Sequence, residues 1–210
     1  MTKLERTADQ ACSRTLATRN RILSAALTLF SEKGYVGATT REIAVEAGVA
    51  ELTLFRHFPK KELIMEELLR SRSSLTALQD IMPQARQLPL KPALVAIAHA
   101  FLDSLRGQKD LNRIFLSEYP RYPEQVKTMH CAFATDLFNT LATFFRELQA
   151  SRVLREVDAV AAAQTFFGIF YAYFISRDLL GFIEPSGRTE EQDISLYLDV
   201  YIRGIVRETT

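Results

Sequence analysis

The chain has 210 residues, of which 48% are hydrophobic and 24% charged, and its formal net charge is +1. This apolar content can bury a substantial core, which excludes an intrinsically disordered chain. A net charge so close to zero argues neither for nor against nucleic acid, so the local arrangement of charges must decide. Glycine and proline are few, at 8 and 7 residues. Strand-like alternation is hard to find, so the pattern favours an all-α fold.

The first 18 residues are polar, with Lys3, Arg6 and Arg14 among Thr, Gln and Asp. Chain ends of this kind are often poorly ordered, so residues 1–18 are predicted to form a flexible tail. The alternative is a basic arm that reaches the backbone or the minor groove of DNA. A helix is predicted next, over residues 19–32, because apolar residues recur there at helical spacing.

Residues 39–61 predict two short helices joined by a tight turn. Thr39 followed three residues later by Glu42 is a capping box, which starts a helix. Gly48 can take the left-handed position that ends it. A second helix is predicted over residues 50–58, with Leu54 and Phe58 on one buried face and mostly polar residues on the others. Two such helices around a glycine-containing turn form a helix-turn-helix.

This stretch closely resembles the DNA-binding signature of the TetR family of bacterial transcriptional regulators. The resemblance extends upstream through residues 22–30 and Lys33-Gly34-Tyr35, and downstream through Lys61-Glu62-Leu63. Several spaced elements must coincide for such a match. The resemblance implies an all-α fold of about nine helices, with a three-helix helix-turn-helix domain at 19–65 and an effector-binding and dimerisation domain at 66–210.

The resemblance also implies which residues contact DNA. Thr40 and Arg41 begin the second helix of the domain, where hydroxyl, guanidinium and free backbone N–H groups can meet phosphate, and Lys61 would clamp a further phosphate. The exposed positions of the recognition helix, which would enter the major groove, are Glu51, Leu52, Thr53, Phe55, Arg56 and His57. An arginine can read guanine, and leucine or threonine can contact a thymine methyl group.

Two of these positions depart from the family pattern. Leu52 stands where a small residue or proline is usual, which could alter how closely the helix enters the groove. Phe55 stands where tyrosine is usual, so it lacks the hydroxyl that would bind phosphate.

Apolar residues at helical spacing predict further helices along the rest of the chain. A long helix is predicted to start near Lys61 and to extend as far as Leu78, and prolines mark a linker over residues 82–90. The later predicted helices cover residues 91–107, 110–118, 124–150, 159–175 and 189–208, with a rigid proline-containing connector at 119–123.

The helix predicted over residues 159–175 is apolar nearly all round, so every side of it must be covered. Its apolar run is short of a membrane span and is interrupted by polar residues. A second copy of the chain is the simplest cover for the face that the core leaves free. The TetR resemblance implies that the last two long helices pair with their mates in a homodimer. The interface residues predicted on this basis are Phe170, Phe174, Leu198, Tyr201, Ile202 and Ile205.

Phenylalanine is abundant, at 14 residues, and most of it lies beyond residue 100. An ordinary core explains this, and the alternative is an aromatic effector pocket of the kind the family often has. The candidate pocket residues are Phe101, Phe115, Met129, Phe133, Phe138 and Phe167. Few charges lie on those faces, so the predicted effector is a small hydrophobic or aromatic molecule.

No residues suggest catalysis or a cofactor. His57, His99 and His130 lie on different predicted helices, and no pair has metal-ligand spacing. Cys12 and Cys131 are far apart, so free thiols in a reducing cytoplasm are expected. The N-terminus lacks the pattern of a secretory signal. We therefore predict a cytoplasmic protein with no membrane segment, no metal, no cofactor and no enzymatic activity.

Together these features predict a homodimeric, ligand-responsive transcriptional regulator. As a repressor it would leave a palindromic double-stranded DNA operator when a small hydrophobic effector binds. The alternative is a helical dimeric regulator without a small-molecule ligand, controlled by a protein partner. An enclosed void among the middle helices would favour the first interpretation, and closed packing the second.

Overall fold

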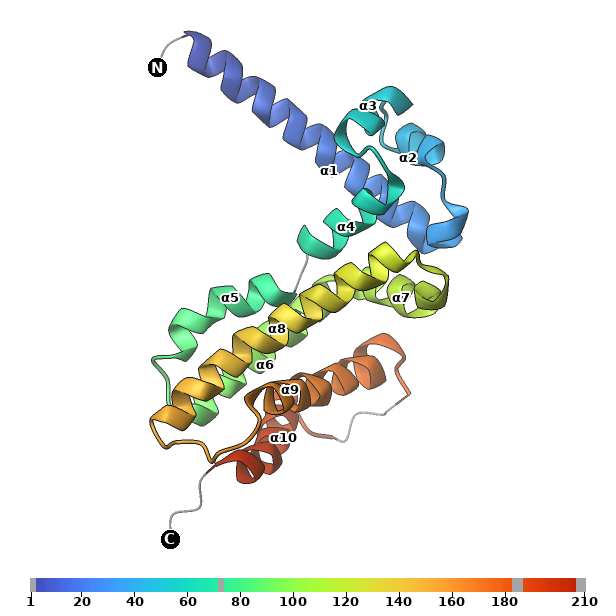
Figure 1. Cartoon of the computed structure of the whole chain (residues 1–210). Coiled ribbons are helices and arrows are strands. Elements are labelled where there is room, and N and C mark those ends of the chain that lie inside the picture. Colours follow the sequence, from blue (N-terminus) through green and yellow to red (C-terminus); the bar gives the residue numbers. More distant parts are fainter. Residues whose placement is uncertain (1–2, 72–73, 183–186, 207–210) are drawn as a thin grey trace. The chain divides into compact units, whose positions relative to one another are not determined.

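The computed structural model describes residues 3–71, 74–182 and 187–206, which are helical nearly throughout (Figure 1). Within those residues the extended pairing is limited to an isolated antiparallel bridge between Leu154 and Val206. The all-α prediction is therefore confirmed.

Compact packing divides the chain into two units. The N-terminal unit comprises Met1–Ser71 and Asp110–His130, and the C-terminal unit comprises Arg72–Lys109 and Cys131–Thr210. The sequence pattern predicted a first domain that ends at residue 65 and did not predict that residues 110–130 would join it.

The N-terminal unit contains the helix-turn-helix and the helices that pack on it. Its elements are α1 (Lys3–Gly37), α2 (Thr40–Glu46), α3 (Glu51–His57), α4 (Lys61–Ser71), α7 (Lys109–Glu118), a 3-10 helix (Tyr119–Arg121) and the first turns of α8 (Glu124–Ala150). The flexible tail predicted over residues 1–18 is instead helical from Lys3 onward. That segment contains neither glycine nor proline, so no residue in it interrupts the helix.

The core of the N-terminal unit draws on both of its segments. α1 contributes Ile22, Ala26 and Phe30, one helical turn apart from each other, and they share one hydrophobic cluster with buried residues of α2, α3 and α4. The buried residues that the second segment adds to this cluster are Leu111, Ile114, Phe115, Tyr122 and Val126. Because these residues are buried against the helix-turn-helix, α7 and the start of α8 are part of its structural support.

The C-terminal unit contains the remaining helices. They are α5 (Ser74–Ala85), α6 (Leu90–Gly107), the rest of α8, α9 (Ala159–Tyr173), a π-helix (Phe174–Leu179) and α10 (Glu190–Ile205). The long helix predicted from Lys61 corresponds to α4 and α5, on either side of residues 72–73, which lie outside the described residues. The linker predicted to begin at residue 82 starts later, because α5 runs through Pro83. Met82 and Ala85 are buried, so tertiary packing outweighs the local effect of the proline.

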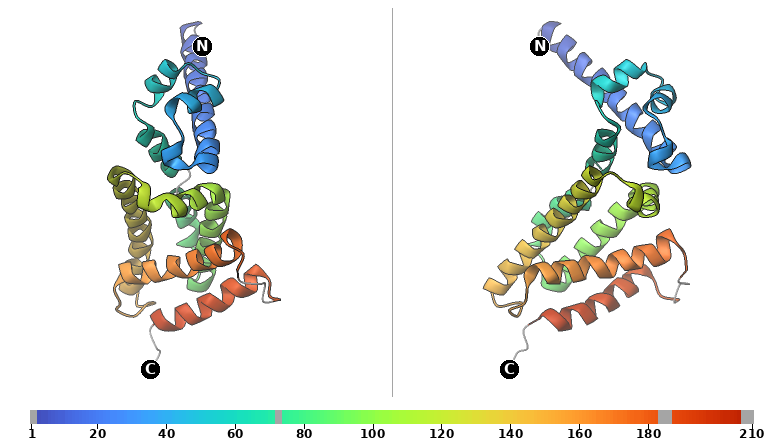
Figure 2. Two further views of the ribbon diagram at one scale, coloured as in Figure 1. Left: turned by 90° about the vertical axis from the view of Figure 1, so that its right-hand side faces the viewer. Right: turned by 45° about the vertical axis from the view of Figure 1, so that its right-hand side comes forward.

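Helices α9 and α10 lie side by side (Figure 2), and the Tyr201 hydroxyl on α10 donates to the Ala162 carbonyl on α9 at 2.8 Å. Asp158 caps α9, since its carboxylate accepts from two backbone N–H groups of the first turn. Thr189 and Gln192 form a capping box at the start of α10. These caps satisfy N–H groups that a helix otherwise leaves without partners.

Ion pairs join α6, the π-helix and α10. Arg106 of α6 pairs with Asp178 and Glu190, while Arg177 and Arg188 both donate to the buried carboxylate of Asp193. The π-helix therefore carries Arg177 and Asp178, which engage two different neighbouring helices. A buried carboxylate with two guanidinium partners is the arrangement expected for a charge removed from water.

The apolar helix extends further than the sequence pattern predicted. With the π-helix it spans Ala159–Leu179, which is long and apolar enough to cross a membrane by length and composition alone. Half of its most apolar stretch is buried inside the chain. Its buried side belongs to the hydrophobic core of the C-terminal unit, through residues such as Phe166, Phe170 and Phe174.

Candidate nucleic-acid interface and effector site

The start of α2 and the turn after it have the predicted geometry. The Thr39 hydroxyl accepts from the Glu42 N–H at 3.2 Å, and the Glu42 carboxylate accepts from the Thr39 N–H at 2.9 Å. Lys33 donates to the same carboxylate at 2.8 Å, and these hydrogen bonds lower the pKa of Glu42 to about 2. Gly48 has φ of 64°, the left-handed conformation predicted for it. Glu42 is therefore ionised and holds the start of α2 in place at neutral pH.

The recognition helix α3 has one buried face and one exposed face. Leu54 and Phe58 are buried, as predicted, so the other faces of α3 are fixed relative to the core. Of the residues predicted to face DNA, Glu51, Leu52, Phe55, Arg56 and the α2 residue Arg41 are exposed, and Thr40, Thr53 and His57 are partly buried. Leu52 is 65% exposed. A leucine this exposed gains little from folding, so its position suits contact with a partner.

Two residues, Thr40 and Arg19, hold α3 through contacts that the sequence did not predict. The Thr40 hydroxyl donates to the Glu51 carboxylate at 3.2 Å, which joins the starts of α2 and α3. Arg19 of α1 lies 4.4 Å from the Phe58 ring centroid, donates to the His57 carbonyl and pairs with Glu67 of α4 at 3.0 Å. A cation at the C-terminal end of a helix also interacts favourably with the helix dipole. Arg19 lies at the start of a predicted helix and belongs to no recognisable motif. The sequence therefore gave no indication that it would contact the end of α3.

Lys61 is placed differently from a freely extended phosphate clamp. Its Nζ donates to the carbonyls of Tyr35 at 2.7 Å and Ala38 at 3.0 Å, and it lies 4.4 Å from the Tyr35 ring centroid. Partial burial lowers the pKa of the Lys61 ammonium. An ammonium has three donors, and these two hydrogen bonds use two of them. The lysine is therefore held at the N-terminus of α4 with one N–H left over.

The six residues predicted to line an effector pocket are divided between the two units. Phe115 and Met129 belong to the N-terminal unit, where Phe115 stacks on His130 at 4.1 Å between ring centroids. Burial lowers the pKa of His130, which favours its neutral form. This pair is part of the support of the helix-turn-helix, whereas the other aromatic candidates belong to the C-terminal unit.

Three of the remaining candidates meet in the C-terminal unit. The Phe167 ring of α9 lies 4.8 Å from Phe101 of α6 and 6.1 Å from Phe138 of α8, between centroids. Phe166 adds a further contact at 5.3 Å. Phe133 is half-buried on α8, five residues before Phe138. We call Phe101, Phe138, Phe166 and Phe167 the aromatic cluster, and its members come from three different helices.

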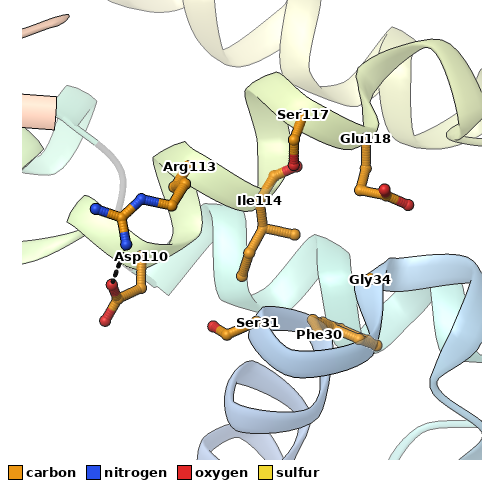
Figure 3. A pocket seen from close by; sticks show the side chains of 8 residues that line it. All are labelled: Phe30, Ser31, Gly34, Asp110, Arg113, Ile114, Ser117 and Glu118. Atoms are coloured by element: carbon orange, nitrogen blue, oxygen red, sulfur yellow. Dashed lines mark hydrogen bonds and ion pairs between the residues drawn. The ribbon is translucent and has the colours of Figure 1, made fainter. Parts of the chain in front are cut away.

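Two clefts open on the N-terminal unit. One, of about 220 Å³, lies between the end of α1 and α7 and is shown in Figure 3; Phe30 and Ile114 face each other across it, with Asp110, Arg113 and Glu118 around it. The other, of about 310 Å³, lies between the start of α4 and α8 and is lined by Leu63, Val126 and Met129 with charged neighbours. Met129 is thus the one predicted pocket residue that lines either of these two clefts.

The predicted dimer residues lie mostly inside the chain. Phe170, Phe174 and Leu198 have no exposed surface, and Tyr201 and Ile205 are also buried. Ile202 is the one member that is partly exposed. The residues of α9 and α10 that do reach the surface include Gly168, Ala172, Leu196 and Val200. Periodicity alone could not separate the two faces, because both are apolar.

The geometry defines a DNA-binding regulator of the helix-turn-helix class. Residues 22–68 match the bacterial regulatory proteins of the TetR family, and residues 92–203 match the C-terminal domain of AefR-like transcriptional repressors. Over 164 residues the chain is 30% identical to the uncharacterized HTH-type transcriptional regulator YvkB of Bacillus subtilis (strain 168), which covers 78% of this chain and 85% of that protein. The chain belongs to the TetR family of transcriptional regulators.

Solved structures share the fold along nearly the whole chain. A TetR family transcriptional regulator from Pseudomonas syringae pv. tomato str. DC3000 has a TM-score of 0.70 at 19% identity, covering 91% of this chain and 98% of its own. The flavonoid-responsive regulator FrrA has a TM-score of 0.69 at 25% identity, with coverage of 91% and 98%. The predicted family and the predicted fold, a helix-turn-helix domain followed by a helical C-terminal domain, are both confirmed.

Proposed function

We propose that this protein is a homodimeric repressor that leaves a palindromic operator when a small hydrophobic or aromatic molecule binds against the aromatic cluster. Two copies related by a two-fold axis would place their recognition helices in successive major grooves, about 34–36 Å apart. A bacterial chromosome lies in the cytoplasm, so we place the protein there.

The DNA-binding part of the proposal rests on the exposed face of α3. The buried Leu54 and Phe58 hold the helix on the core. Leu52 and Arg56 of α3 are exposed, as is Arg41 of α2. Arginine forms paired hydrogen bonds with the major-groove edge of guanine, and an exposed leucine can contact a thymine methyl group. Arg56 is thus the residue to which we assign base recognition.

Replacing Arg56 with alanine should change base preference. If Arg56 reads guanine, the cost should be about 1–3 kcal/mol at one position of each half-site, with little effect elsewhere. The measurement is a selection of bound duplexes from a random pool, followed by titration of the selected site and its single-base variants. Arg113→Ala, which removes an exposed arginine from α7, is the matched control and should keep the wild-type profile. An R56A variant that ranks all single-base variants as the wild type does would remove Arg56 from base recognition.

The effector part rests on the aromatic cluster. Phe101, Phe138 and Phe167 come from α6, α8 and α9, and their rings are in mutual contact through Phe167. A flat aromatic molecule can stack against such rings or lie edge-on to them. FrrA, which matches this chain over most of its length, is a flavonoid-responsive regulator. We therefore choose a flavonoid, naringenin, as the first probe.

Naringenin should raise the melting temperature and weaken operator binding. A ligand that binds only the folded state stabilises it by about 2.7 kcal/mol at a hundred times its Kd. Phe138→Ala should reduce both responses while leaving operator affinity without ligand unchanged, because Phe138 is only half-buried and lies outside the N-terminal unit. Phe182→Ala, at an exposed phenylalanine, is the control. If a panel of aromatic and aliphatic probes leaves melting temperature and operator affinity unchanged, control by a protein partner becomes the better interpretation.

A further inference from the structure

The position of Lys61 depends on a chain of contacts inside the N-terminal unit. Its ammonium donates to the Tyr35 and Ala38 carbonyls and lies over the face of the Tyr35 ring, at 4.4 Å from the centroid. A cation over an aromatic face is attracted by the ring quadrupole, and the attraction depends on where the ring lies. Any shift of Tyr35 therefore moves both a carbonyl partner and the ring that hold Lys61.

Tyr35 is in turn held by Tyr122. The two rings meet edge to face at 5.2 Å between centroids, and Phe30 packs against Tyr35 at 5.3 Å. Tyr122 follows the 3-10 helix between α7 and α8 and is stacked on Phe115 of α7 at 5.2 Å. It is buried, as is Tyr35. Tyr122 is distant from the helix-turn-helix in the sequence, yet its ring forms part of the packing around Tyr35.

The rings of these two tyrosines, and not their hydroxyls, make the contacts that matter here. Both hydroxyl groups are buried, and neither has a hydrogen-bond partner among the residues that the structure describes. A hydroxyl without a partner adds nothing favourable to folding. Removing the Tyr122 hydroxyl should therefore preserve the arrangement, whereas removing its ring should not.

We propose that Tyr122 is a positioning residue for DNA binding: its ring holds Tyr35 in place, and Tyr35 holds the Lys61 ammonium at the N-terminus of α4, where it meets a DNA phosphate. This inference rests on the proposed function and on the phosphate contact that the TetR resemblance predicts for Lys61. The N-terminus of α4 also presents free backbone N–H groups, which favour an anion at the same place.

The test is the salt dependence of operator binding, because each phosphate contact contributes about 0.9 to the slope of log affinity against log salt concentration. The full-length protein is compared with Lys61→Ala, Tyr122→Ala, Tyr122→Phe and the double variant of Lys61→Ala with Tyr122→Ala. Both single alanine variants should lower the magnitude of the slope by about one, and the double variant should lower it no further. Tyr122→Phe should keep the wild-type slope.

Tyr119→Ala is the matched control for Tyr122→Ala. Tyr119 lies in the same connector and also packs on Phe115, at 5.2 Å between centroids, but its cationic neighbour is Lys127 rather than Lys61. It should therefore keep the wild-type slope. If Tyr122→Ala does not fold, Tyr122→Leu is the alternative variant. Leucine fills the position with apolar atoms but has no aromatic ring to pack against Tyr35, so the same loss of slope is expected.

The outcomes separate the two claims. If Lys61→Ala lowers the slope and the Tyr122 variants that lack the ring do not, Tyr122 does not position Lys61 and the inference is wrong. The same conclusion follows if the double variant loses about two, since independent contacts add. If Lys61→Ala itself leaves the slope unchanged, the proposed phosphate contact fails, and the role of Tyr122 fails with it.

Discussion

Replacing Phe174 with glutamate should unfold the C-terminal unit and should not release a folded monomer. The TetR resemblance assigned Phe174 to the dimer interface, but its side chain has no exposed surface within one chain. It lies at the start of the π-helix, among the buried residues of α6, α8, α9 and α10. A carboxylate placed there has no cation among those apolar neighbours, and burying an unpaired charge costs far more than burying a neutral polar group.

The expected loss is comparable to the whole stability of the fold. Domains of this size are stable by only about 5–15 kcal/mol, and removing a buried phenylalanine side chain alone costs about 3–5 kcal/mol. Circular dichroism should therefore show loss of the cooperative melting transition together with a large loss of helix signal. Phe182→Glu, at a side chain that is 66% exposed, is the control and should melt within a few degrees of the wild type. A Phe174→Glu protein with the wild-type melting temperature would show that the site is open to water.

Replacing Val200 with glutamate should instead give a folded monomer that binds its operator weakly. Val200 on α10 is 70% exposed, and Leu196 is exposed one turn before it. Gly168 and Ala172 are exposed on the neighbouring α9, and small residues let helices approach closely. We propose that this face, and not the buried set predicted from the family resemblance, pairs with the second copy. A charge at the centre of an apolar interface is left without a partner or water, so association should fail.

Sedimentation at micromolar concentration should show a dimer for the wild type and a monomer for Val200→Glu, with helix content and melting retained. A single half-site contact lacks the gain from simultaneous binding, so operator affinity should fall by on the order of a hundredfold or more. Leu116→Glu is the control, because Leu116 is 45% exposed on α7 in the N-terminal unit, and it should remain dimeric. A dimeric Val200→Glu protein would place the interface elsewhere, and a monomeric wild type would contradict the homodimer itself.

The local features of the helix-turn-helix could be predicted because their causes are local. Thr39 and Glu42 are three residues apart and satisfy each other's backbone groups, so the start of α2 depends on those residues alone. Gly48 has the left-handed φ that its position after α2 requires. Leu54 and Phe58 share one face of a short helix, and both are buried as predicted. The resemblance to the TetR family rests on the same closely spaced residues.

The contacts between distant segments could not be predicted in the same way. Tyr122 packs against Tyr35, and residues 110–130 join the unit of the helix-turn-helix. Nothing in the spacing of either segment specifies the other, since hydrophobic burial is non-directional and any complementary apolar face could have covered Tyr35. The carbonyls that hold Lys61 are backbone groups, which every sequence carries, so no side-chain pattern marks them.

The sequence by itself determined most of the helical segments, where most of them begin, and which family the helix-turn-helix resembles, because caps, turn glycines and helical periodicity act over a few residues. The tertiary structure alone decided which apolar face is inside. α9 is apolar on nearly every side, and its periodicity does not distinguish Phe170, which is fully buried, from Ala172, which is exposed. That distinction depends on where α6, α8 and α10 lie around the helix, and packing against partners distant in sequence sets it.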